Sequence, residues 1–78
     1  MKLVVFSVYD SKAEAFLSPF YSQSRGTAVR SFSEAAQDEK HQFHRHAADF
    51  TLFELGEFDQ FTGQFSMYEA KVELGYTS

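Results

Sequence analysis

The chain has 78 residues and no cysteine, and its seven Lys and Arg stand against eleven Asp and Glu, giving a net charge of −4. This length supports one hydrophobic core, so we expect a single domain over residues 1–78 rather than two. The acidic balance argues against a protein that coats DNA by neutralising phosphates alone, and the lack of cysteine excludes disulfides and thiolate metal sites.

The first predicted element is a strand over residues 3–9, where β-branched and aromatic residues end at a polar turn. Such a run is typical of a central strand that is covered on both faces. Residues 15–21 are predicted to form a second strand that pairs back on the first. Pro19 lacks an amide donor, so it is expected at a strand end or at a sheet edge.

A helix is predicted next, with Thr27 as its N-cap and its end near Asp38. The expected buried stripe consists of apolar residues at helical spacing, namely Val29, Phe32 and Ala36, and it is widened by Ala28 and Ala35. Arg25 and Arg30 lie near the predicted helix start, where positive charge opposes the helix dipole. Helix stability therefore does not explain these two charges.

The second half of the chain is predicted to begin with a polar, His-rich loop over residues 39–49, because neither period is present there. A strand over residues 50–58 follows, in which Gly56 predicts a bulge or a close backbone approach. Residues 59–63 predict a hairpin connection with Gly63 in the left-handed region, and residues 64–69 the returning strand. The tail from Ala70 fits either a short edge strand or an arm that reaches a neighbouring subunit.

The order strand, strand, helix, strand, strand predicts an α+β fold, a small antiparallel sheet with one helix packed on a face. Ten Phe and four Tyr are many for so small an interior, so we expect some rings on a contact surface and we expect self-association. The apolar run over residues 3–6 is too short for a signal peptide or a membrane span. A cytoplasmic protein with no membrane role is therefore expected.

Catalytic and metal-binding patterns are weak in this sequence. His41, His44 and His46 have Asp49 as the nearest carboxylate, and a metal site normally needs further supported ligands, so a solvated segment whose charge responds to mildly acidic pH is favoured. The sequence has no nucleophile elbow and no glycine-rich phosphate loop. Four carboxylates around the predicted hairpin could act as the paired acids of a glycosidase, but such an enzyme needs a deep cleft, so a solvated hairpin face is favoured: Glu54, Glu57, Asp59 and Glu69. We expect a nonenzymatic protein without a cofactor.

A surface for single-stranded nucleic acid is the remaining candidate, because aromatic rings can stack on bases while basic residues follow the phosphates. The candidate residues all precede residue 46: Lys12, Phe16, Phe20, Tyr21, Arg25, Arg30, Lys40 and Arg45. The alternative is that the Phe residues fill the core and the charges only keep the protein soluble.

Three motifs stand in order along the chain. Residues 9–12 read YDSK, residues 16–20 read FLSPF and are followed by TAVRSF at 27–32, and residues 46–59 read HAADFTLFELGEFD with TG at 62–63. In order and spacing they resemble the small nonstructural protein of gokushovirus-type microviruses, the VP5 family of single-stranded DNA phages. The resemblance implies a phage accessory that acts in the host cytoplasm during genome replication, by binding single-stranded DNA or by switching duplex synthesis to single-strand synthesis.

The leading hypothesis is a nonenzymatic replication accessory that forms a homodimer through sheet edges. It presents basic residues to single-stranded DNA or to a replication protein: Arg25, Arg30, Lys40 and Arg45. The alternative is a protein-interaction or scaffolding module that binds a phage or host protein through exposed Phe and Tyr. The first hypothesis predicts binding that weakens with salt, and the second predicts partner capture that survives high salt.

Overall fold

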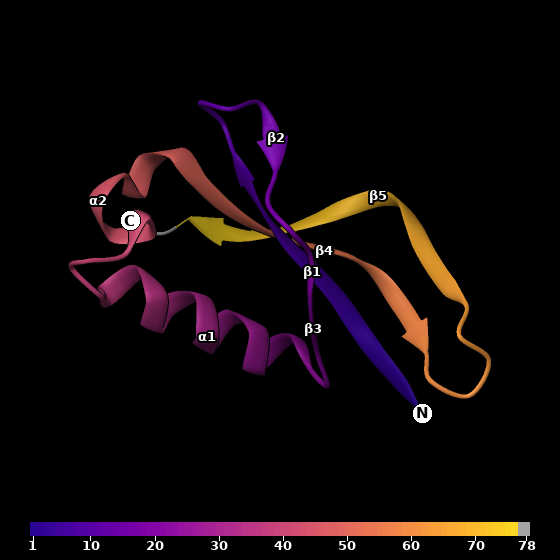
Figure 1. The fold of residues 1–78 in the computed structure, drawn as a ribbon. Helices are drawn as coiled ribbons and strands as arrows, with labels where there is room; N and C mark the ends of the chain where they lie inside the picture. The colour runs from indigo at the N-terminus through magenta and orange to yellow at the C-terminus, as the bar shows by residue number, and fades with distance from the viewer. Residues whose placement is uncertain (77–78) are drawn as a thin grey trace.

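The computed structural model describes residues 1–76 and shows a twisted antiparallel sheet with a helix lying along one of its faces (Figure 1). The elements in chain order are β1 (Lys2–Asp10), β2 (Ala15–Phe16), β3 (Phe20–Ser22), α1 (Arg25–Gln37), α2 (Gln42–Arg45), a 3-10 turn (Ala47–Asp49), β4 (Phe50–Asp59) and β5 (Phe65–Tyr76). The strand order is β2-β1-β4-β5, with β3 also paired to β1. The predicted α+β class and the helix on one face are confirmed.

The predicted second strand exists, but it is broken into two pieces. Tyr9 pairs with Phe16 of β2 and Val5 pairs with Tyr21 of β3, so both pieces return along β1. Residues 17–19 between them carry no strand pairing and include Pro19, which has no amide donor for a ladder. The Ser7 hydroxyl donates to the Leu17 carbonyl oxygen at 2.6 Å and holds this break against β1. Pro19 therefore lies at the sheet edge, as predicted.

β4 pairs along the whole of β1, and β5 pairs with β4 to form the other edge. The predicted bulge at Gly56 is confirmed, because the register of β4 shifts between Glu54 and Gly56 both against β1 and against β5. A Cβ on Gly56 would lie 2.5 Å from the backbone oxygen of Ser66, so the close backbone approach is present as well. The returning strand is longer than predicted: β5 continues as an edge strand through residues 70–76, and residues 77–78 lie outside the described chain.

The helix starts earlier than predicted. Its N-cap is Ser24, whose hydroxyl oxygen accepts the Thr27 amide at 3.2 Å, so the prediction of Thr27 as N-cap is wrong. The predicted buried face is confirmed except at Val29, which is 37% exposed, because Ala28 and Phe32 are buried and Ala36 is half-buried. Ala28, Phe32 and the half-buried Ala35 follow the spacing i, i+4 and i+7, which keeps one stripe of α1 against the sheet.

The predicted loop over residues 39–49 is also wrong, because α2 and the 3-10 turn occupy most of it. His41 caps α2 through its ring Nδ1, which accepts the Phe43 amide at 3.1 Å. Phe43 is buried, with its ring centroid 5.2 Å from that of Phe32 and 4.9 Å from that of Phe50. One apolar side chain therefore docks this segment onto the core.

The main cluster of buried apolar residues lies between the helices and one face of the sheet. Its buried members are Phe6, Val8, Ala28, Phe32, Phe43, Phe50 and Leu52. Phe20 of β3 packs at the edge of this cluster, with its ring stacked 5.7 Å from that of Phe6. We call this side of the sheet the helix face.

Candidate functional site

The opposite side of the sheet carries a second set of apolar side chains that α1 and α2 do not cover. Side chains alternate along β1, so Phe6 and Val8 on the helix face place Val5, Ser7 and Tyr9 on the other side. Residues directly opposite in the register share a face, which extends this side across the sheet. We call it the open face and define it by Leu3, Val5, Ser7, Tyr9, Phe16, Tyr21, Phe53, Phe58, Phe65, Met67 and Lys71.

Aromatic rings on the open face form two groups. In the first group, Phe16 of β2 lies 5.0 Å from Tyr9 and 5.6 Å from Phe53, measured between ring centroids. In the second group, the ring of Phe65 lies 4.7 Å from Phe58 and 6.4 Å from Tyr21. The two groups flank a strip of buried small residues on the central strands. This strip keeps the rings of each group close to the sheet.

Much of this aromatic surface remains accessible. Phe16 is 38% exposed, Tyr21 is 44% exposed and Phe65 is 53% exposed, and Met67 beside them is 54% exposed. Soluble monomers rarely expose a continuous apolar patch of more than a few hundred Å², and such patches mark binding sites. The predicted surplus of rings over interior space is therefore found on one face of the sheet.

Charge is sparse on the open face. The ammonium nitrogen of Lys71 lies 5.9 Å from the centroid of the Phe16 ring, at the distance of a cation–π contact. Glu73 stands opposite Phe53 in the register, so a carboxylate shares this face with Lys71 on β5. A ligand that covers the open face thus meets mainly rings.

The structure distributes the predicted site residues over different surfaces. Tyr21 lies on the open face, whereas its neighbour Phe20 points to the helix face and packs on Phe6. The predicted cations do not gather around either residue. Lys12 lies in the turn after β1, and Arg30 pairs with Glu34 on the outer side of α1. Lys40 lies shortly before α2, and Arg45 is the last residue of α2. Phe53, Phe58, Phe65 and Lys71 were not among the predicted residues.

A family model described as Phage ORF5 protein matches residues 3–77. The chain belongs to the Phage ORF5 protein family. The match extends from β1 into the last residues of β5, so it includes every strand that contributes to the open face. This membership establishes a phage protein. No curated protein and no solved structure matches the chain.

Arg25, another predicted site residue, has a structural partner in this phage protein. Its Nε donates to Glu54 Oε1 at 2.7 Å, and the hydroxyl of Tyr68 donates to Glu54 Oε2 at 2.7 Å. The hydrogen bond from Arg25 holds the pKa of the buried Glu54 carboxyl below its ordinary value, and the bond to Glu54 raises the pKa of Tyr68 to about 12. The contact explains why a cation stands at the start of α1 against the helix dipole.

We expect Glu54→Gln to destabilise the fold by about 1–3 kcal/mol, because a buried charged acceptor is lost. The lowered pKa of Glu54 means that its stabilisation is complete above the ordinary carboxyl pKa and disappears as pH falls through the lowered value. The raised pKa of Tyr68 means that its share is complete below its ordinary value of 10.0 and is lost as pH rises to about 12. Urea unfolding at a series of pH values measures the loss of stability at low pH and at high pH. Both losses should be smaller in the variant.

The matched control is Glu34→Gln, which removes the exposed pair with Arg30. Its cost should stay within about 0.5 kcal/mol and should not change the pH dependence. Equal losses for the two variants would contradict the assignment of Glu54 as the anchor between α1, β4 and β5.

The His-rich segment and the hairpin carboxylates have separate structural contacts. His41 caps α2, and the ring Nδ1 of His44 lies 2.9 Å from the Ala36 carbonyl oxygen. Glu57 pairs with Lys2 at 3.7 Å, and Asp59 accepts backbone amides of its own turn. Over residues 1–76, no group of three or more His, Cys, Asp or Glu is placed to hold a metal ion. No helix in this range is long and apolar enough to cross a membrane.

Proposed function

We propose that this phage protein is a nonenzymatic accessory of viral DNA replication that binds single-stranded DNA on the open face, in the host cytoplasm. The observation that carries the proposal is an aromatic sheet face that neither helix covers. Membership of a phage family supports it, and so does the resemblance of residues 9–63 to the small nonstructural protein of gokushovirus-type microviruses. No reacting group or cofactor takes part in this function.

Stacking is the chemistry that the open face offers. Every base has a π-face, so exposed rings bind single strands without strong sequence preference. On β1, Tyr9 lies opposite Phe16 of the first ring group and Val5 lies opposite Tyr21 of the second. These two positions are four residues apart. At about 3.3 Å per residue, the two groups are separated by about 13 Å along the strand. Bases a few nucleotides apart on one strand can therefore stack on different groups.

We expect Phe16→Ala and Phe65→Ala each to weaken the binding of a labelled single-stranded oligonucleotide about tenfold or more, because each removes a stacking surface. Because Lys71 lies over the Phe16 ring and few other charges stand near the ring groups, the salt dependence should be shallow, with a logarithmic slope of about −0.7 for each phosphate contacted. Fluorescence anisotropy at several salt concentrations measures affinity and slope.

The controls are Arg30→Ala and Lys40→Ala, which remove cations on and beyond α1. Both should leave affinity within about twofold, since neither residue lies on the open face. If these variants abolish binding while Phe16→Ala and Phe65→Ala do not, the basic residues carry the interaction and the open face does not. Absence of binding even at low salt would remove direct DNA contact altogether.

A protein-binding role for the open face is the second candidate. Glu73 shares this face with Lys71, and a carboxylate repels phosphates but is readily accommodated by a protein partner. On this reading, the face captures a phage or host replication protein as an interaction module. Pull-down from infected cells with and without nuclease separates the candidates, because only partners bridged by nucleic acid are lost after nuclease.

We also propose that the protein forms homo-oligomers, and the shape of the two sheet edges limits how two copies can pair. The edge formed by β2 and β3 is interrupted at residues 17–19, which include Pro19. The β5 edge is irregular between Met67 and Val72, where its register against β4 shifts. Breaks and bulges of this kind hinder a continuous ladder with a second sheet. We therefore expect copies to associate through side-chain contacts rather than through backbone pairing of their sheet edges.

A further inference from the structure

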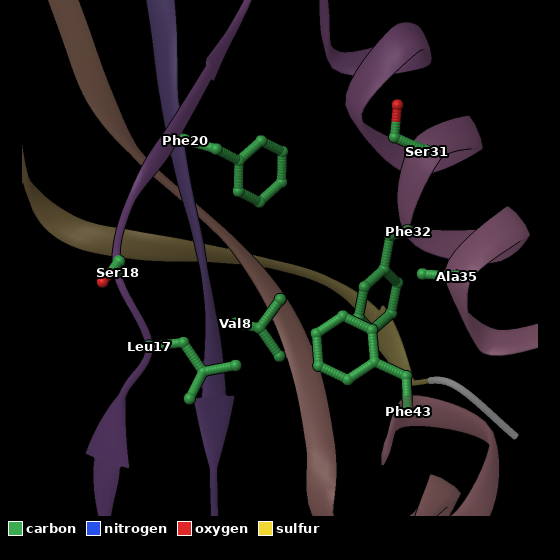
Figure 2. A pocket seen from close by; sticks show the side chains of 8 residues that line it. All are labelled: Val8, Leu17, Ser18, Phe20, Ser31, Phe32, Ala35 and Phe43. Carbon is green, nitrogen blue, oxygen red and sulfur yellow. The ribbon is translucent and has the colours of Figure 1, made fainter. Parts of the chain in front are cut away.

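An apolar pocket of about 230 Å³ opens between α1 and the broken edge of the sheet (Figure 2). It is lined by Val8, Leu17, Ser18, Phe20, Ser31, Phe32, Ala35 and Phe43. Small side chains create the space, because Ser31 and Ala35 lie one turn apart on α1 and Ser18 lies in the unpaired break. Ser18 and Ser31 are exposed, whereas Val8 and Phe32 are buried. The two serines stand at the exposed rim, and the surface of the pocket itself is almost entirely apolar.

Phe61, at the tip of the hairpin between β4 and β5, is the complementary feature. It is 85% exposed, and within residues 1–76 its ring makes no aromatic contact. Its turn is well ordered by hydrogen bonds: Asp59 Oδ1 accepts the Phe61 amide at 2.8 Å and the Thr62 amide at 3.3 Å, and Gly63 adopts a φ of 75°. The bond from the Phe61 amide holds the pKa of Asp59 below its ordinary value. A fixed turn therefore presents an unpacked ring to solvent.

The ring cannot reach the pocket of its own chain. The Gln60 amide donates to the Met1 carbonyl oxygen at 2.9 Å, which places the hairpin beside the start of β1. Val8, in the pocket, lies seven residues further along the same strand, or about 23 Å at 3.3 Å per residue. Figure 1 shows the hairpin and the α1–α2 region at opposite ends of the molecule, whose longest extent is 39 Å.

We propose that Phe61 of one copy inserts into the pocket between α1 and the β2–β3 edge of a second copy. The sizes agree, because an apolar protein cavity of about 150 Å³ accepts benzene, and this pocket is larger. Insertion removes an exposed ring and an apolar hollow from water in one step. The ring and the pocket are separate surfaces of each copy. In a heterologous arrangement each copy gives its ring to one neighbour and its pocket to another, and copies join head to tail.

The interface is small, since one ring and its turn enter one pocket. Contacts of this size give weak association, with a dissociation constant on the order of 10⁻⁴ M. Sedimentation velocity of the purified chain without DNA should therefore show an average mass that rises with concentration and passes that of a dimer. Chain growth beyond the dimer distinguishes the head-to-tail contact from a closed two-fold pair.

Two variants separate the halves of the contact. Phe61→Ala removes the ring and keeps the pocket, whereas Ser31→Trp fills the pocket mouth and keeps the ring. Each alone should associate roughly 30-fold more weakly, as when a buried aromatic anchor is lost. An equimolar mixture of the two should form one intact contact and stop at a dimer. Gln60→Ala, next to Phe61 at the tip, is the matched control and should associate like the parent chain.

The proposal is overturned if Phe61→Ala associates as the parent chain does, or if the mixed variants remain monomeric although circular dichroism shows both folded. Because the experiment contains no DNA, its result is independent of whether the open face binds single strands. Phe61 is not on the open face, so binding of a short oligonucleotide should be unchanged in Phe61→Ala.

Discussion

Phe6→Ala is expected to destabilise the protein by about 3–5 kcal/mol, as typical for a Phe truncated in a well-packed core. Phe6 is fully buried at 0% exposure, stacks on Phe20 and joins Val8 and Leu52 in the core. Domains are stabilised by about 0.05–0.15 kcal/mol per residue, so this loss would remove much or all of the stability of a chain this short. Urea unfolding followed by circular dichroism measures it.

Phe65→Ala is the matched control, because it makes the same chemical change on the open face. Phe65 is 53% exposed, so less apolar burial is lost and we expect a cost of about 1 kcal/mol or less. A cost equal to that of Phe6→Ala would mean that the open face is covered in solution and is not free for DNA. The pair of variants thus tests whether the two aromatic faces of the sheet have different roles.

The existence of two apolar faces could be predicted from alternation alone. In the strand over residues 50–58, Phe50 and Leu52 lie on one side, and Phe53 and Leu55 lie on the other. The single predicted helix can cover only one of these faces, so the other face is left without a helix. The membership of each ring group could not be predicted, because Phe16 meets Phe53 across β1 only in the register that the folded sheet adopts.

Local errors in the prediction have physical causes. The predicted stripe on α1 was centred on Val29 and only widened by Ala28, although Ala28 is buried and Val29 is exposed. Docking of residues 42–45 depends on the single side chain of Phe43, and a helix of four residues is too short to show a period. Tertiary packing rather than local pattern determines both features.

The predicted basic residues lie at separate places in the fold, although they are close together in the first half of the sequence. Arg25 is the first residue of α1 and Lys40 lies beyond its end, and the 13 residues of this helix span about 20 Å at 1.5 Å per residue. Arg25 is also held by Glu54. Three rings of the open face belong instead to the acidic second half of the chain, namely Phe53, Phe58 and Phe65. Their side chains point to this face because side chains alternate along β4 and β5. Strand alternation could have identified these three residues. They were missed because the predicted nucleic-acid surface was placed in the basic first half of the chain.

Gly56→Ala is expected to cost about 3 kcal/mol, the upper end of the usual range for an over-packed site. A Cβ at this position would lie 2.5 Å from the Ser66 carbonyl oxygen and 2.8 Å from Met67 Cα. Both atoms belong to the backbone of β5, so no side-chain rotation relieves the overlap and the two strands must move apart. The movement would shift Phe65 from Phe58 and thereby disturb the second ring group as well. Urea unfolding and oligonucleotide anisotropy should both detect the change.

Gly26→Ala provides a control in which the same substitution should have the opposite sign. Gly26 lies in α1, and a Cβ there meets nothing within 4 Å. Alanine should stabilise the helix by about 0.5–1 kcal/mol, because it lowers the entropy lost on folding. If Gly56→Ala were as harmless as Gly26→Ala, β5 would not cross β4 as closely as the structure shows. The second ring group, which depends on that crossing, would then have to be placed differently on the open face.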